Sequence, residues 1–215
     1  MTSGMSHDYP ARLDIDYPEE GLSRIKTLFR IVLIIPIFIL AGLVTGQVGV
    51  NGLGNGPIGG NLWLWLTVSG LFLPTVLMIL FRQKYPRWWF DWNLEVTRFS
   101  TRVWAYMLLL REEYPSTEEQ QAIHLELDYP DATRDLNRGL PIVKWILAIP
   151  HYISIIILSI PALLSVIVAW FAIIFTGRYP RTLFDFVVGL NRWSLRVSAY
   201  MWLLTTDRYP PFSLK

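Results

Sequence analysis

The sequence predicts an all-α integral membrane protein with four transmembrane helices in two hairpins, two interfacial amphipathic helices and a small cytoplasmic β-strand pair. Three observations lead to this fold class: the composition, the distribution of charge along the chain, and an internal tandem duplication. Of the 215 residues, 53% are hydrophobic and only 17% are charged. Because charged residues make up about 25% of a typical soluble domain, the composition favours a membrane protein.

Charged side chains are missing from two long stretches of the chain. No Asp, Glu, Lys or Arg occurs at 31–81 or at 145–177. A membrane-crossing helix needs about 20 apolar residues, so each stretch has room for two helices joined by a short connection. We therefore expect transmembrane helices at 28–44, 62–81, 141–159 and 161–176. The last of these is short for a full crossing.

The basic residues set the expected orientation of these spans. The connections within the two hairpins, 45–61 and 159–161, carry no Lys or Arg, and every basic residue lies on the side that both ends of the chain share. Cytoplasmic segments next to membrane spans are enriched in Lys and Arg. The sequence therefore predicts a multi-pass protein of the cytoplasmic (inner) membrane with both termini in the cytoplasm.

The chain repeats itself. The segment 13–18, Leu-Asp-Ile-Asp-Tyr-Pro, returns at 125–130 as Leu-Glu-Leu-Asp-Tyr-Pro, and the residues around Arg98 and Arg102 return around Arg192 and Arg196. A period of this kind indicates a repeated structural unit. We expect each unit to contain a strand, two spans and an amphipathic helix. The expected boundaries are 9–115 for unit one, 116–121 for the linker and 122–215 for unit two.

Each unit opens with a pattern of period two, which is typical of a strand with one buried face. Leu13 and Ile15 alternate with Asp14 and Asp16, and residues 124–129 alternate in the same way. A lone strand leaves its backbone groups unpaired, so we expect these two strands to pair with each other.

Each unit closes with a long amphipathic helix, at 87–110 and at 181–205. The apolar residues of both helices follow the spacing of three and four that places them on one face. They are Trp89, Trp92, Val96, Phe99, Val103, Met107 and Leu110, and then Leu183, Phe186, Leu190, Trp193, Val197, Met201 and Leu204. A helix with aromatic residues on one face and arginines on the other suits the membrane interface, whereas crossing the membrane would bury the arginines at a cost of several kcal/mol each.

The polar faces of these two helices supply the candidate binding residues. They carry the same three charged residues at helical spacing, namely Asp91, Arg98 and Arg102 in unit one and Asp185, Arg192 and Arg196 in unit two. Such a face is suited to anionic lipid headgroups or to acidic residues of a partner protein. The alternative is that these residues pair with neighbouring helices or loops and hold the helix in place.

His151 is the one histidine in the two stretches without charged residues, which makes it a candidate intramembrane titratable group. The alternative is a neutral histidine bonded to a backbone carbonyl that Pro150 leaves free. The other two histidines, His7 and His124, have no companions at ligand spacing, and the chain has no cysteine. We therefore predict no metal site and no catalytic residues.

The end of the second unit carries a specific set of motifs. They are Tyr-Pro-Arg at 179–181, Phe-Asp-Phe at 184–186, Arg-Trp at 192–193, Arg-Val-Ser-Ala-Tyr at 196–200 and Asp-Arg-Tyr-Pro-Pro-Phe at 207–212. In these motifs the chain resembles the bacterial membrane-protein family called domain of unknown function 4389. The resemblance extends from about Tyr9 because the first unit is a weaker, tandem copy. It implies a bacterial integral membrane protein, and the family offers no catalytic residues to carry over.

Together these observations lead us to expect a non-enzymatic accessory or scaffold subunit of a bacterial membrane complex, which holds a partner or lipid with its cytoplasmic amphipathic helices. The alternatives are a lipid- or quinone-binding membrane protein and, less favoured, a small transporter or channel. The expected partners are membrane lipids and another membrane protein or a second copy of the chain. The net charge of +2 argues against nucleic acid. No cofactor is predicted, with a bound lipid or quinone as the alternative.

Overall fold

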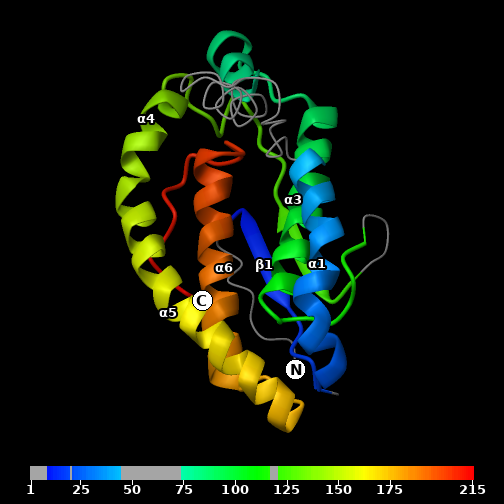
Figure 1. Cartoon of the computed structure of the whole chain (residues 1–215). Coiled ribbons are helices and arrows are strands. Elements are labelled where there is room, and N and C mark those ends of the chain that lie inside the picture. The colour runs from blue at the N-terminus through cyan, green and yellow to red at the C-terminus, as the bar shows by residue number, and fades with distance from the viewer. Residues whose placement is uncertain (1–8, 20, 45–73, 117–120) are drawn as a thin grey trace, which may run out of the picture.

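The computed structural model describes residues 9–19, 21–44, 74–116 and 121–215. Two short strands, a π-helix (η1) and five α-helices make up this part of the chain (Figure 1). In chain order they are β1 (Ala11–Ile15), α1 (Arg24–Val44), η1 (Met78–Arg82), α3 (Arg87–Met107), β2 (Ile123–Leu127), α4 (Leu140–Leu147), α5 (Ile149–Thr176) and α6 (Arg181–Met201).

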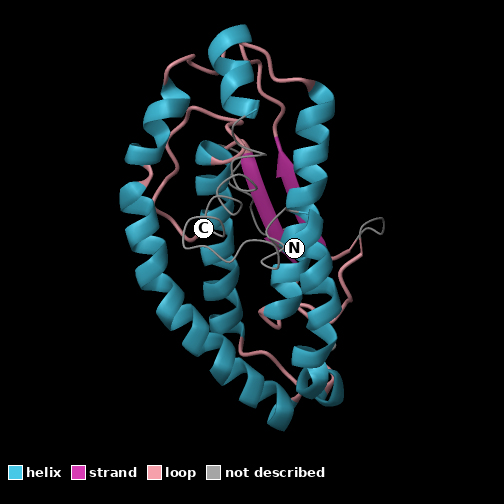
Figure 2. Ribbon diagram, turned by 45° about the horizontal axis from the view of Figure 1, so that its top comes forward, coloured by secondary structure: helices cyan, strands magenta, loops and turns pink. Residues whose placement is uncertain are grey.

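The elements form three layers. The outer layer consists of α1 and α5, which contact each other, and of α4, which leads into α5. The inner layer consists of α3, which packs on α1, and α6, which packs on α5. The third layer is the sheet, whose two strands lie side by side in Figure 2. Because β1 packs on α6 and β2 packs on α3, each strand rests on the inner helix of the other predicted unit.

The two strands pair as the alternating pattern predicted. They are antiparallel, with Leu13 opposite Leu125 and Ile15 opposite Ile123. The apolar residues of both strands are buried toward the inner helices. The intervening polar residues form the other face of the sheet, which we call the polar sheet face: Arg12, Asp14, Asp16, His124, Glu126 and Asp128.

The third and fourth predicted spans are not a hairpin. Only Ala148 separates α4 from α5, and α5 continues through Pro161 to Thr176. A proline inside a helix removes one backbone hydrogen bond and here does not end the helix. The helix ends where Gly177 takes a left-handed conformation (φ 74°), which favours glycine.

The prediction of four transmembrane helices in two hairpins is therefore wrong. Within the described residues one segment, Leu140–Thr176, is long and apolar enough to cross a membrane. The first predicted span, 28–44, is helical within α1, while most of the second, 62–81, and the whole connection 45–61 lie outside the described residues. The prediction that both termini lie in the cytoplasm was based on two hairpins, and the structure does not support that basis.

The two amphipathic helices are also not interfacial, because both lie in the inner layer. Leu190, Trp193 and Val197 of α6 form an apolar cluster with Ala162 of α5 instead of facing lipid. In α3, Phe99 and Val103 pack likewise on α1. The opposite side of α6 meets β1, so that this helix is covered on two sides.

Candidate functional site

The most distinctive surface of the molecule is the outward side of α4 and α5. Only 11% of the most apolar window of Leu140–Thr176 is buried, although such a segment would form the core of a soluble protein. We define the apolar outer face by the exposed large residues of α4, α5 and α1. They are Ile142, Val143, Ile146, Leu147, Ile149, Ile153, Ile156, Ile157, Ile160, Leu163, Leu164, Ile167, Val168, Phe171 and Phe175, with Ile25, Leu28, Phe29, Leu33 and Ile35.

The sequence of α5 explains why one side faces outward. Its buried residues, His151, Ala162, Ala169 and Ile173, share one side of the helix, and the small alanines allow α6 to approach closely. Ile155, Leu158, Val166 and Trp170 are partly buried against the same clusters, and the large apolar residues on the opposite side of α5 are exposed. A helix that is apolar all round needs an apolar environment on both sides, and the described part of the chain supplies it on one side.

The structure places Arg98 and Arg192 at the outer edges of the two strands. In an antiparallel sheet, opposite residues alternate between hydrogen-bonded and non-hydrogen-bonded pairs. Asp16 and Ala122 form a hydrogen-bonded pair. Leu13 and Leu125 are therefore a non-hydrogen-bonded pair, and their carbonyl groups point away from the partner strand. Arg192 Nε donates to Leu13 O at 2.8 Å, and Arg98 Nε donates to Leu125 O at 3.2 Å. These two arginines thus cap backbone groups that would otherwise be unpaired.

The second pair of predicted arginines binds the segment that follows each inner helix. Arg102 Nη1 donates to Ser116 O at 2.6 Å, and Arg196 donates to the carbonyls of Ser213 and Lys215. Burial lowers the pKa of Arg196. All four arginines thus donate to backbone carbonyls of other segments, as the second interpretation expects, and binding of a headgroup or a partner by them stays a prediction.

The two predicted aspartates do not join these arginines. Asp91 on α3 and Asp185 on α6 are exposed. Neither has a hydrogen bond or ion pair with any other residue that the structure describes. Arg192 instead forms its ion pair with Asp14 of β1 at 2.6 Å, and Arg98 pairs with Glu95 on its own helix at 2.6 Å.

His151 is fully buried between α5 and α6, and its partner is not a backbone carbonyl. Trp193 Nε1 donates to His151 Nδ1 at 3.1 Å, and the ring of Phe212 stacks on the imidazole with centroids 4.0 Å apart. Because Nδ1 accepts a hydrogen bond, the proton of a neutral ring sits on Nε2, which has no partner among the described residues. A functional role for its titration stays a prediction.

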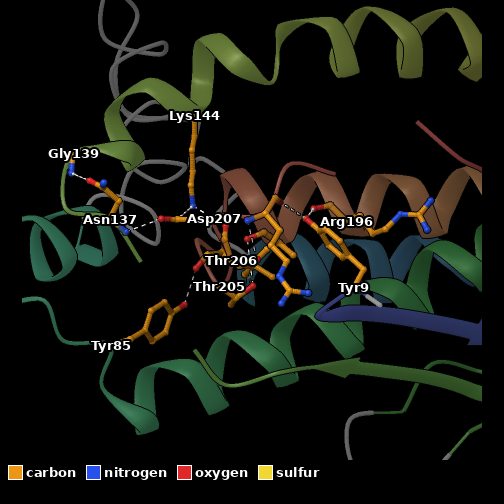
Figure 3. A network of polar contacts seen from close by, with 12 residues as sticks. Tyr9, Tyr85, Asn137, Gly139, Lys144, Arg196, Thr205, Thr206 and Asp207 are labelled. Atoms are coloured by element: carbon orange, nitrogen blue, oxygen red, sulfur yellow. Dashed lines mark hydrogen bonds and ion pairs between the residues drawn. The ribbon is translucent and has the colours of Figure 1, made fainter. Parts of the chain in front are cut away.

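A buried ion pair at the start of α4 was not predicted from the sequence. Lys144 has an exposed fraction of 0%, and its Nζ lies 2.7 Å from Asp207 Oδ1 (Figure 3). The same Nζ donates to Thr206 O at 2.8 Å, and Asn137 N donates to Asp207 Oδ2 at 2.6 Å. The only signal in the sequence is the position of Lys144, directly before the stretch 145–177 that has no charged residue.

Tyr9 ties the beginning of the described chain to the same region. Its hydroxyl donates to Arg208 O at 3.1 Å and lies 3.4 Å from Arg196 O. Burial of the ring raises the pKa of Tyr9. The phenol therefore stays protonated and acts as a donor over the physiological pH range.

A pocket of about 440 Å³ lies where the strands meet the segment after α6. It is lined by Tyr9, Pro10, Asp128, Tyr129, Pro130, Asp135, Thr205, Thr206, Asp207 and Arg208. The lining carries charges of both signs, so the pocket is suited to a small polar group rather than to a quinone ring. In the described ranges no three His, Asp or Glu side chains come together as metal ligands.

Comparison with known proteins agrees with the motifs of the second unit. The model of the family described as domain of unknown function (DUF4389) matches residues 141–213, from α4 to the segment after α6. No curated protein and no solved structure matches the chain. The match does not reach the first unit, so it leaves the tandem form of the family a prediction. Residues 141–213 are therefore similar to the family described as domain of unknown function (DUF4389).

Proposed function

We propose that this chain is a non-enzymatic accessory or scaffold protein of the bacterial cytoplasmic membrane, attached through its apolar outer face. The observation that carries the proposal is the exposure of Leu140–Thr176. The sequence led us to assign partner and lipid binding to the amphipathic helices. Because those helices lie in the inner layer, we assign contact with lipid or a partner to α1, α4 and α5 instead.

The size of the apolar outer face supports attachment to a membrane. Removing a Leu, Ile or Phe side chain from water contributes about 1.5–3 kcal/mol when burial is complete. Monomeric soluble proteins rarely expose a contiguous apolar patch of more than a few hundred Å². Neither a soluble core helix nor an N-terminal signal sequence fits the segment, since little of it is buried and it begins at Leu140.

The positions of the charged groups support a scaffold rather than an enzyme. Arg98, Arg192 and Arg196 bond to backbone carbonyls of neighbouring elements, and Lys144 pairs with Asp207. These bonds connect segments that lie far apart in the chain and hold the fold together. A scaffold needs such a rigid body and an open surface, and it needs no reactive cluster.

Native mass spectrometry of the protein, gently extracted from its host membrane, tests the proposal. We expect the protein in the membrane fraction and a mass that includes another membrane protein or a second copy of the chain. A protein found only in the aqueous fraction would contradict membrane attachment. A lone chain in the membrane, without a partner, would contradict the scaffold role.

Binding of a lipid is the second candidate function, and the pocket beside Asp207 favours it. A cavity with charges of both signs, next to the start of α4, is suited to a polar headgroup. Organic extraction of the purified protein, followed by mass spectrometry, distinguishes the two functions. A stoichiometric lipid in the extract supports lipid binding, and an extract without lipid or quinone contradicts it.

A further inference from the structure

We propose that the apolar outer face lies flat in one leaflet of the bilayer and that the segment Leu140–Thr176 does not cross it. This inference rests on the membrane attachment proposed above and goes further, because it fixes the orientation of the molecule. The occupant of the face is a lipid bilayer that contains anionic lipids. The argument starts from the polar sheet face, on the opposite side of the molecule.

Residues 9–17, which include β1, accompany α6 along almost its whole length. Tyr9, before β1, bonds to Arg196 O, Leu13 accepts from Arg192, and the hydroxyl of Tyr17, after β1, donates to Tyr179 O. A strand rises about 3.3 Å per residue, so residues 9–17 cover a distance close to the thickness of the hydrocarbon core, about 30 Å. The paired strand Ala11–Ile15 is the middle of this segment, so the segment as a whole, and not the sheet alone, reaches across most of that thickness.

The same stretch of α6 runs beside α5. Trp193 bonds to His151 near the start of α5, and Leu190 packs with Ala162 further along it. The outer helix, the inner helix and the sheet thus lie at the same level along the long axis of the molecule, as Figure 1 shows for α5, α6 and β1. If α5 crossed the bilayer, the sheet would lie at the depth of the hydrocarbon core.

The polar sheet face makes that position unfavourable. Glu126 and Asp16 keep more than half of their side-chain surface exposed, at 59% and 56%. A single charged residue at the centre of a bilayer costs about 2.5–3.5 kcal/mol on insertion scales, and more in other treatments. Arg12 pairs with Glu126 and Asp128, and Asp16 lies 3.4 Å from His124, an ion pair only when the histidine is protonated. These contacts offset part of the cost but leave the exposed carboxylate surfaces to be removed from water.

If the molecule lies flat on the bilayer, the charged sheet stays in water and the apolar outer face is still buried in lipid. With α1, α4 and α5 in the plane of the membrane, their outward residues enter the boundary between headgroups and acyl chains, as in other interfacial helices. The inner layer then lies above the lipid, and the polar sheet face points into water. No charged side chain of the sheet has to leave water.

The distribution of charge selects the lipid. Exposed basic residues flank the outer helices: Arg24 and Lys26 at the start of α1, Arg134 and Arg138 before α4, and Arg178 and Arg181 after α5. Two of them pair with carboxylates, Lys26 with Glu112 and Arg134 with Asp131, and the other four form no ion pair with any residue that the structure describes. Four carboxylates lie on the polar sheet face, at the far side of the molecule. Each Lys or Arg close to an anionic membrane surface contributes about 1 kcal/mol, so the charge pattern favours the same orientation as the apolar face.

Depth measurements along α5 test the orientation. The chain has no cysteine, so single cysteines carry spin labels without a background. We would label Ile146, Ile160 and Phe175, bind each protein to vesicles of phosphatidylethanolamine and phosphatidylglycerol, and measure collision with oxygen and with a water-soluble nickel complex. We expect three similar, shallow depths. A label at residue 160 that lies at the bilayer centre, between two labels near the headgroups, would overturn the proposal.

Sided labelling of the two ends of the segment provides an independent test. Arg138→Cys and Arg178→Cys lie before α4 and after α5, and Glu126→Cys on the polar sheet face is the matched control. We expect a membrane-impermeant maleimide to modify all three from the same side of inverted or intact membrane vesicles. Modification of positions 138 and 178 from opposite sides would overturn the proposal.

The two tests separate this inference from the proposed function. A protein that does not sediment with the vesicles contradicts membrane attachment itself. A protein that sediments with them but shows a crossing in depth or in sided labelling contradicts only the flat orientation.

Discussion

Residues that repeat in the sequence make the same contacts in both halves of the molecule. Arg192 bonds to Leu13 O, as Arg98 does to Leu125 O. Two tyrosines outside this set repeat in the same way, because the hydroxyl of Tyr17 donates to Tyr179 O and that of Tyr129 donates to Tyr85 O. The arginines were candidates for headgroup binding, and the structure uses them to hold strands.

Substitution of Arg192 tests this role. Arg192→Ala loses the bond to Leu13 O and the ion pair with Asp14 and leaves the edge of β1 uncapped. We expect the free energy of unfolding to fall by about 1–3 kcal/mol, as for loss of a hydrogen bond to a charged group. Thermal unfolding in detergent measures the change, with exposed Arg134→Ala as the control. Equal stability of the two variants would show that Arg192 does not hold the strand.

We expect substitutions of Lys144 and of Asp207 to have strongly non-additive effects on the free energy of unfolding. Lys144 is fully buried, so Asp207→Asn leaves an uncompensated buried charge, which costs about 3–5 kcal/mol. Lys144→Met alone leaves the partly exposed Asp207 and costs less. The double variant is expected to recover part of the loss, because neither charge remains. A double-mutant cycle of unfolding free energies checks this, and strictly additive effects would contradict the pairing.

Glu112 predicts a pH-dependent contribution to stability. Burial raises the pKa of this carboxyl, but bonds from Ser23 N and Lys26 Nζ outweigh it, so the pKa lies below its ordinary value of 4.5. A lowered folded-state pKa stabilises the fold above the unfolded value, and this contribution disappears as the pH falls through the folded value.

Glu112→Gln measures that contribution. We expect the variant to unfold at a lower temperature than the wild type at pH 7, because the charged form of Glu112 binds Ser23 and Lys26. The difference between the two proteins should shrink when unfolding is followed at progressively lower pH, below 4.5. A difference that stays the same at acidic pH would assign the effect to packing rather than to charge.

At the scale of elements, the sequence predicted which segments form strands and long helices. The alternation around Leu13 and Leu125 gave both strands and their pairing, since a single strand has no partner for its backbone. The amphipathic helix predicted at 181–205 is observed as Arg181–Met201. Its position was wrong because amphipathicity identifies a polar face, and that face can meet a strand edge as well as water.

Two features of the elements were not predicted from the sequence: the continuity of α5 and the pairing of Lys144 with Asp207. Absence of charge sets the length of an apolar stretch but does not locate a turn, so Pro161 was taken for a break that the helix does not make. Lys144 and Asp207 come from segments far apart in the chain, and nothing local to either residue indicates the other.

Continuity of α5 is a testable consequence of that correction. Ile153 and Phe171 both face outward and lie on either side of Pro161. In one continuous helix, with a rise of about 1.5 Å per residue, their backbones are about 27 Å apart, whereas a hairpin at 159–161 would bring them much closer. Double electron–electron resonance between labels at positions 153 and 171 distinguishes the two arrangements, and a short distance would restore the hairpin.

At the scale of the whole molecule, the two predicted units are interlocked and not stacked side by side. Each strand packs on the inner helix of the other unit, so the matched domain at 141–213 depends on β1 for the cover of α6. This arrangement joins an apolar outer layer to a polar sheet through the two helices of the inner layer, α3 and α6. One side of the molecule is therefore apolar and the opposite side is charged. We expect the apolar side to face the membrane and the charged side to face water.

The most direct test of this account is flotation of the purified protein with liposomes in a density gradient. We predict that the wild type rises with the lipid and that Ile157→Lys with Leu164→Lys, on the apolar outer face, greatly reduces the floating fraction. Glu126→Lys, on the polar sheet face, is the matched control and should float like the wild type. Wild-type protein that stays in the aqueous fraction, or a double variant that floats equally well, would contradict the claim that this face meets the membrane.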